Sequence, residues 1–144
     1  MSPVNLYPEG RLAKAAAMGH AEAEIDIARK PDEVWAVVGD FGGLDNWLQG
    51  VDSCRLEGEN RVLSMMNMEI TETLRRKDDD ARQLVYGITA GVPVQHHEAT
   101  ITVGPGGDGS HVTWAVDTDD AMTDMMIGIY QQGLQALKQH VESR

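Results

Sequence analysis

The C-terminal stretch of the chain, residues 121–141, constrains the fold more than any other. Its apolar and small residues recur at steps of three and four, which predicts one continuous face of an α-helix about 30 Å long. Acidic Asp119 and Asp120 precede the helix and Lys138 lies near its end, as the helix dipole favours. Methionine adapts to irregular shapes and Gly133 leaves space, so this face predicts a core with a cavity in it. The residues of the face are Met122, Met125, Met126, Ile129, Gly133, Ala136, Leu137 and His140.

Residues 51–118 predict a long series of antiparallel strands. Apolar residues alternate with polar ones there, and short segments rich in glycine, proline or aspartate separate most of the runs. The connections are too short for parallel crossovers, so neighbouring strands should pair antiparallel. The candidate strands are residues 51–57, 61–67, 68–77, 82–89, 95–103 and 111–118.

The N-terminal part adds one strand and two short helices. Alternation over residues 21–27 predicts a half-buried strand, Pro31 begins an amphipathic helix, and residues 44–48 form a second short helix. The predicted fold class is α+β, with a curved seven-stranded antiparallel sheet wrapped around the long C-terminal helix. We expect residues 19–144 to form this single domain and residues 1–18 to be a flexible extension.

The composition narrows the class of partner. The chain of 144 residues has 23 acidic and 12 basic side chains, a net charge of −11 that argues against binding to nucleic acid or to anionic membranes. Its single cysteine, Cys54, excludes an intramolecular disulfide, and no stretch approaches the ~18 apolar residues of a membrane span. Because no secretory signal precedes the domain, we expect a cytoplasmic protein without membrane insertion. The oligomeric state stays open, with a homodimer among the options.

Strand alternation predicts which residues line the cavity, because successive side chains of a strand point to opposite faces. The apolar faces of three predicted strands each include one polar residue: Glu72, Tyr86 and His97. Replacing Gly133 with leucine or isoleucine should fill the cavity and leave the fold intact. The remaining residues expected to bind the ligand come from the strand faces and the helix: Met68, Ile70, Leu84, Ile88, Ile101, Trp114, Met122, Met125, Met126, Ile129 and Gly133.

The three polar residues admit two interpretations. In an apolar site the carboxyl group of Glu72 should favour its protonated form, His97 could exchange a proton near neutral pH, and the Tyr86 hydroxyl could polarise a carbonyl group. Together they could then catalyse enolisation and loss of water from a carbonyl ligand. Alternatively, the three side chains only bond one another or orient a ligand, without turnover.

A metal site or cofactor is not expected. His96 and His97 are adjacent on a predicted strand and should point to opposite faces, so one metal ion could not easily use both. The cluster of Asp117, Asp119 and Asp120 lacks the glycine and closing glutamate of an EF-hand. The glycine-rich residues 104–109 lie between two strands and predict a hairpin connection rather than a phosphate-binding loop.

Several segments carry a family resemblance. The clearest is Val-Pro-Val-Gln-His-His-Glu-Ala-Thr-Ile-Thr-Val at residues 92–103, supported by Ile-Thr-Glu-Thr-Leu at 70–74, by residues 78–86, and by Gly-Ser-His-Val-Thr-Trp at 109–114. In this order they resemble the polyketide cyclase/dehydrase-like family of the SRPBCC (START/Bet v 1-like) superfamily. The resemblance covers about residues 21–141.

The resemblance implies a helix-grip fold with a deep apolar cavity between the sheet and the long helix. Members use this cavity for lipids, steroids, plant hormones or polyketides; some catalyse cyclisation or dehydration, and many only bind. We therefore expect a small hydrophobic or amphipathic ligand. The alternatives are a cyclase or dehydratase acting on a polyketide-like carbonyl substrate, and a protein-interaction module that uses the outer surface and the N-terminal extension.

Overall fold

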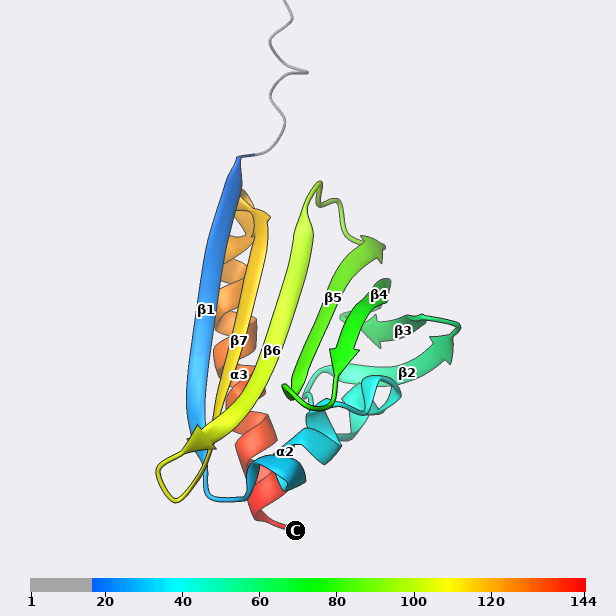
Figure 1. Cartoon of the computed structure of the whole chain (residues 1–144). Coiled ribbons are helices and arrows are strands. Elements are labelled where there is room, and N and C mark those ends of the chain that lie inside the picture. Colours follow the sequence, from blue (N-terminus) through cyan, green and yellow to red (C-terminus); the bar gives the residue numbers. More distant parts are fainter. Residues whose placement is uncertain (1–16) are drawn as a thin grey trace, which may run out of the picture.

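The computed structural model describes residues 17–144 and shows a seven-stranded antiparallel sheet curved around one long helix (Figure 1). The strand order in the sheet is β1-β7-β6-β5-β4-β3-β2. The predicted α+β helix-grip fold is confirmed. The strands are β1 Met18–Ile27, β2 Val51–Glu57, β3 Asn60–Met65, β4 Met68–Asp78, β5 Gln83–Ala90, β6 His97–Gly106 and β7 Gly109–Asp119. The helical elements are α2 Pro31–Val38, η2 Phe41–Asn46, η3 Asp120–Met122 and α3 Thr123–Glu142.

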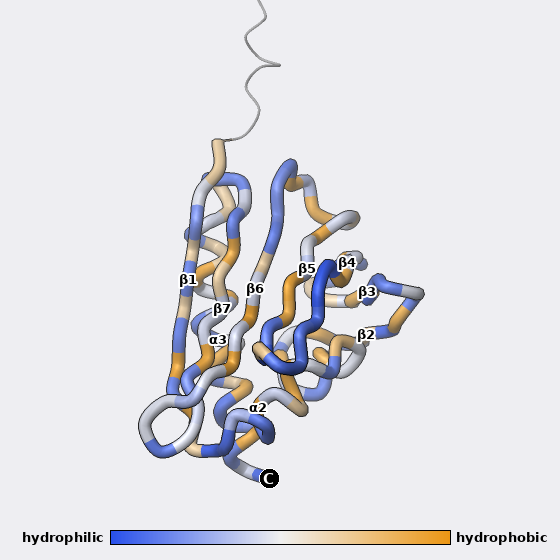
Figure 2. Tube along the Cα trace, viewed as in Figure 1, coloured by the Kyte–Doolittle hydropathy of each residue, from blue (hydrophilic) through white to orange (hydrophobic). Residues whose placement is uncertain are grey.

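Strand β1 completes one edge of the sheet by pairing along its whole length with β7. Its alternation has the predicted effect: Ala21, Ala23 and Ile27 are buried. Figure 2 shows the same alternation of hydrophobic and hydrophilic residues along β1. The strand begins at Met18, a residue that the sequence placed at the end of the extension. The rest of that extension, residues 1–16, lies outside the described residues.

Helix α3 packs across the concave side of the sheet, behind it in the view of Figure 1. Its buried face consists of Met126, Tyr130, Gly133, Leu134, Leu137 and Val141. This face is rotated from the predicted one, since Met125 is 52% exposed whereas Tyr130 and Leu134 are in the core. The rotation arises because an α-helix has 3.6 residues per turn. Steps of three and steps of four therefore drift to opposite sides of the helix, and the sequence pattern alone does not fix which side is buried.

Tight hairpins join the later strands. Strands β6 and β7 continue into the glycine-rich segment as far as Gly106 and Gly109, so the predicted hairpin there is shorter than expected. Between β3 and β4, Met66 and Asn67 form a two-residue turn in which both have positive φ, 52° and 60°. Such turns favour asparagine or glycine, and methionine is unusual in the left-handed region. The turn places Met66 at the rim of a cavity between the sheet and α3.

Helix α2 covers the opposite end of the sheet from the start of α3 (Figure 1). Pro31 occupies its first turn, and the Glu33 carboxylate accepts a hydrogen bond from the Lys30 backbone N–H at 3.1 Å. The Trp35 indole N–H donates to the Asp79 carboxylate at 2.9 Å and ties the helix to the turn between β4 and β5. Among the described residues, no helix has the length and apolar character needed to cross a membrane.

Candidate functional site

A cavity of about 310 Å³ lies between the sheet and α3. This volume is at the lower end of the range for pockets that bind small molecules. Its wall is formed mainly by β3, β4, β5, the loop before β6 and the first half of α3, with single residues from η2, η3, β6 and β7 and from the segment after η2. The residues on the wall are Leu44, Leu48, Leu63, Met65, Met66, Met68, Ile70, Glu72, Tyr86, Ile88, Gly91, Val92, Pro93, His97, Trp114, Met122, Met125, Met126, Ile129 and Tyr130.

Methionines dominate one end of this cavity. Six of the eight methionines of the chain are on its wall: Met65, Met66, Met68, Met122, Met125 and Met126. Met66, Met68 and Met125 are 62%, 40% and 52% exposed, whereas Glu72, Tyr86 and Tyr130 are nearly inaccessible at 8%, 2% and 3%. The cavity therefore has an exposed methionine rim and a buried polar floor. Thioether side chains are flexible and polarisable, so such a rim can adapt to ligands of different shape.

The wall includes most of the residues that the sequence places there. Glu72, Tyr86 and His97 all lie on it. Leu84 and Ile101 do not: they are 1% and 2% exposed and pack within the core. The other predicted residues that lie on the wall are Met68, Ile70, Ile88, Trp114, Met122, Met125, Met126 and Ile129.

Gly133 has a different role from the predicted one. It is not on the wall of this cavity, although it lines an adjoining pocket that also includes Met65, Met66, Met125 and Ile129. A Cβ atom placed on it would be 2.8 Å from Trp114 Cζ3 and 2.9 Å from Leu48 Cδ1, so the absence of a side chain lets α3 approach the indole ring closely. The expectation that Gly133 could be replaced by leucine without harm to the fold is therefore wrong, because a larger residue has no room.

Glu72 forms a buried ion pair with Arg61. Arg61 was not among the residues predicted from the sequence. The Arg61 Nε atom donates to Glu72 Oε1 at 2.7 Å, and the two side chains are 2% and 10% exposed. Arg61 also donates to the Phe41 carbonyl oxygen at 3.1 Å, and its guanidinium carbon lies 4.1 Å from the Phe41 ring centroid and 4.7 Å from that of Tyr86. Glu72 is thus not the unpaired carboxyl group that the acid/base interpretation assumed.

Strand alternation contained the signal for Arg61. On β3 it shares a face with the buried Leu63, and in the β3–β4 ladder it is the direct cross-strand partner of Glu72. A buried carboxylate needs a cation or hydrogen-bond donors, and Arg61 is the basic residue in register with it. The pairing could have been inferred by treating the two strands together.

Two tyrosines and a tryptophan form the floor of the cavity. The Trp114 indole N–H donates to the Tyr86 hydroxyl oxygen at 3.1 Å. The Tyr130 ring stacks on the Trp114 ring, with centroids 4.1 Å apart and an angle of 6° between their planes. Burial, followed by the nearby Glu72 charge, raises the pKa of Tyr86, and burial likewise raises the pKa of Tyr130. Both hydroxyl groups therefore keep their protons at neutral pH.

The Tyr130 hydroxyl group makes no hydrogen bond of normal geometry among the described residues, although the Tyr86 hydroxyl is near enough to contribute to its raised pKa. Tyr130 is only 3% exposed and lies on the cavity wall, so a further partner for its hydroxyl would have to be a molecule inside the cavity. A buried hydroxyl without a partner costs free energy, so its position on a cavity wall requires an explanation, and one is that it bonds to a molecule held in the cavity. Tyr130 was not among the residues predicted from the sequence, although it lies four residues after Met126 and so on the same face of the helix.

His97 is held as a neutral ring. The backbone N–H of Ile88 donates to its Nδ1 atom at 3.1 Å, which leaves the ring proton on Nε2. Burial, together with a smaller effect of the Arg75 charge, lowers the pKa of His97 to about 4; a backbone hydrogen bond of His97 and the Asp119 charge oppose the shift. The prediction that His97 exchanges a proton near neutral pH is therefore wrong. Its Nε2–H can donate to a ligand, but the ring has no free nitrogen with which to act as a base.

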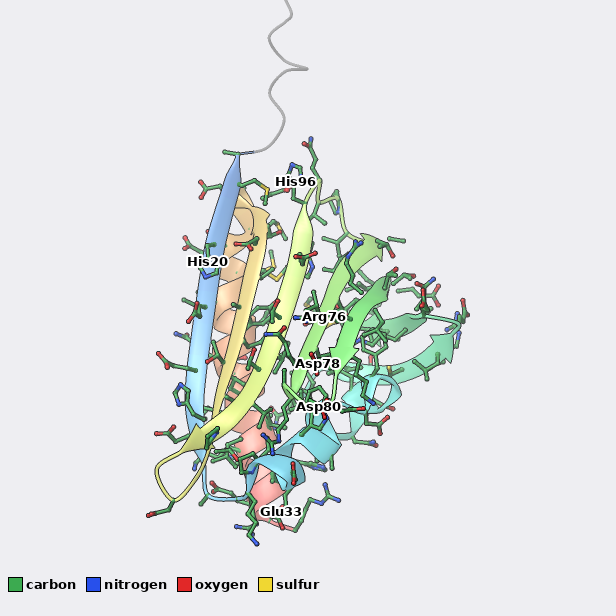
Figure 3. All side chains as sticks on the ribbon, in the orientation of Figure 1. His20, Glu33, Arg76, Asp78, Asp80 and His96 are labelled. Atoms are coloured by element: carbon green, nitrogen blue, oxygen red, sulfur yellow. The ribbon has the colours of Figure 1, made fainter. Side chains whose placement is uncertain are left out.

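The neighbouring His96 lies outside the cavity. It is exposed at the start of β6 (Figure 3), and its backbone N–H donates to the Asp119 carboxylate at 2.8 Å. The Asp119 carboxylate also accepts from the Gln95 N–H at 2.9 Å, and these bonds hold the loop that contributes Val92 and Pro93 to the wall. Within residues 17–144, no group of three or more histidine, cysteine or acidic side chains could hold a metal ion.

The sequence profile described as polyketide cyclase / dehydrase and lipid transport matches residues 18–142. Among solved structures, the protein XoxI from Bacillus cereus is similar, with a TM-score of 0.80, 29% identity, and coverage of 86% of this chain and 96% of that one. An uncharacterised protein from Bacillus thuringiensis also has a TM-score of 0.80 and 29% identity, over 86% and 99% of the two chains. A protein from Thermobifida fusca, with a TM-score of 0.73 and 23% identity over 86% and 93%, shares the fold. No curated protein sequence matches the chain.

Proposed function

The chain belongs to the polyketide cyclase / dehydrase and lipid transport family, and on this premise we propose that it binds a small, uncharged, largely apolar molecule in the cavity between its sheet and α3. The observation that supports this most strongly is the cavity itself. The cavity has a volume of about 310 Å³, and its wall is apolar except for a few buried polar groups. Such a cavity is typical of a site for a small hydrophobic ligand.

The chemistry of the wall supports binding more than catalysis. A general base must be able to take a proton, but the Glu72 carboxylate is held by Arg61 and Nδ1 of His97 accepts a backbone hydrogen bond. The tyrosine hydroxyls have raised pKa values and are weak acids. The cyclase or dehydratase alternative needs one of these groups to exchange protons, so we favour a binding protein, with a lipid, steroid or polyketide-like molecule as its ligand.

Native mass spectrometry of freshly purified protein, followed by solvent extraction, tests whether a ligand is retained. We expect an added mass that extracts as an apolar compound. A second experiment adds an apolar probe, 2-ethylnaphthalene, to the apo protein and to two matched variants of α3. Ile129 lies on the wall and Ile127 does not, although both are half-buried on the same helix.

Ile129→Trp should fill part of the cavity and weaken binding of the probe at least tenfold, whereas Ile127→Trp should change it less than twofold. Circular dichroism would check that both variants fold. Equal binding to the wild type and to Ile129→Trp would refute the proposed site. Measurable turnover of a polyketide-like substrate that is lost in Glu72→Gln would instead favour the enzyme.

A further inference from the structure

The three aromatic residues of the floor have more hydrogen-bond donors than acceptor oxygens, and the Glu72 carboxylate on the same wall accepts from Arg61. Trp114, Tyr86 and Tyr130 contribute one polar hydrogen each, but only the two tyrosines contribute an oxygen, and the Tyr86 oxygen already accepts from Trp114. Even if one hydroxyl donated to the other, one hydrogen would remain. The unpartnered hydroxyl of Tyr130 is the group left over. The Nε2–H of His97 adds a further donor on the same wall.

The charges of the wall select against anionic ligands. Glu72 is its one acidic residue, and it contains no lysine or arginine. The nearby Arg61 is already paired with Glu72, so no cation is left for a bound carboxylate. An anionic ligand would lose its hydration and meet a carboxylate of like charge, both of which are unfavourable in a buried site.

From this arrangement, and on the basis of the proposed binding function, we infer that the ligand is an uncharged compound whose inner end carries a carbonyl oxygen, as in a ketone or an ester, which accepts a hydrogen bond from the Tyr130 hydroxyl. The apolar body of the ligand extends from the tyrosine floor to the methionine rim. Stacking of Tyr130 on Trp114 fixes the ring and hence the position of the hydroxyl, so the donor is pre-oriented. Free carboxylic acids of the same size are excluded.

Three probes of nearly the same shape test the inference: 2-ethylnaphthalene, 2-acetylnaphthalene, and 2-naphthoate, which is ionised at neutral pH. Binding to the full-length wild type and to Tyr130→Phe would be followed by NMR titration of ¹⁵N-labelled protein. In the wild type the ketone should bind three to ten times more tightly than the hydrocarbon, the range expected for one net hydrogen bond. The naphthoate should bind more weakly than both.

In Tyr130→Phe the ketone and the hydrocarbon should bind equally, and the hydrocarbon should bind as in the wild type. The melting temperature of this variant should be unchanged or higher, because the hydroxyl group that it loses has no partner. If the variant failed to fold, the order of the three probes in the wild type would still decide the question.

The inference is overturned if the ketone and hydrocarbon bind the wild type equally, if their ratio is unchanged in Tyr130→Phe, or if the naphthoate binds best. In each of those cases the proposed binding function stands, because the hydrocarbon still binds. If none of the three probes binds, the proposed function fails, and the inference fails with it.

Discussion

The buried ion pair between Arg61 and Glu72 allows a quantitative prediction. Both side chains are almost inaccessible, at 2% and 10% exposure, so each charge depends on the other for compensation. Removal of one partner from such a pair commonly costs about 3–5 kcal/mol in unfolding free energy, because the remaining charge is buried without a counter-charge. Arg61→Met should show this cost in full, since Glu72 would then face an apolar cavity.

Glu72→Gln should cost less, about 2–4 kcal/mol, because Arg61 keeps its hydrogen bond to the Phe41 carbonyl and its contacts with two aromatic rings. The double variant Arg61→Met/Glu72→Leu should lie within about 1 kcal/mol of the wild type, since a well-packed apolar pair often replaces a buried ion pair at no cost.

Urea unfolding of the wild type, both single variants and the double variant completes a double-mutant cycle for the ion pair. With a slope of about 2 kcal/mol/M, a loss of about 4 kcal/mol lowers the unfolding midpoint by about 2 M. If each single variant lost less than about 1 kcal/mol, or if the losses were additive in the double variant, the two charges would not depend on each other and the assigned role of Arg61 would be wrong.

Two further predictions concern His97 and the glycines of α3. Burial lowers the pKa of His97 from its ordinary value of 6.5 to about 4, so the folded protein favours the neutral ring. The unfolding free energy of the wild type relative to His97→Gln should therefore be highest above pH 6.5. It should fall by up to about 3 kcal/mol as the pH decreases to about 4. Urea unfolding of both proteins between pH 4 and 7 checks this. If the unfolding free energies of the two proteins changed in parallel with pH, the prediction would be contradicted. A Cβ atom at Gly133 would crowd Trp114 and Leu48, whereas one at Gly128 would meet nothing within 4 Å. Gly133→Ala should therefore lower the unfolding free energy by about 1–3 kcal/mol, and Gly128→Ala should raise it by about 0.5–1 kcal/mol through helix propensity. Equal effects of the two substitutions would refute the close packing at Gly133.

The order and kind of the elements could be predicted from the sequence because each depends on local patterns. Alternation placed β2 at its observed bounds, and Pro31 marked the start of α2. The hairpin at Met66 and Asn67 has no glycine or proline, and asparagine alone is a weak turn signal, so the two adjoining strands were predicted to meet there without a turn. Its positive φ angles come from the pairing of β3 with β4 rather than from local preference.

Residues of the cavity wall could be predicted from the sequence where strands form the wall and less so elsewhere, while their part in binding stays a prediction. A strand has a period of two residues, so one apolar residue fixes the face of its neighbours; Glu72, Tyr86 and His97 were placed on the wall in this way. Alternation does not reveal whether another side chain covers a residue, which is why Leu84 and Ile101 were expected on the wall but lie beneath it.

The positions of buried charged and aromatic residues were harder to predict from the sequence. Arg61 was overlooked because arginine is usually exposed, and only its register with Glu72 makes its burial favourable. Tyr130 was overlooked because the helix face was assigned from its methionines. The ion pair of Glu72 and the hydrogen bond that His97 accepts involve partners from other strands, so they could not be derived from one strand alone.

The methyl groups of methionine offer the most direct test of the central claim that the cavity binds a small apolar molecule. Six of the eight methionines line the cavity, and Met18, which is exposed on β1, serves as an internal control. With ¹³C-labelled methionine methyls, saturation with 2-acetylnaphthalene should shift most of the signals of Met65, Met66, Met68, Met122, Met125 and Met126 through the ring current of the probe, and leave that of Met18 unchanged. If these signals did not move, or moved no more than that of Met18, the cavity would not be a binding site.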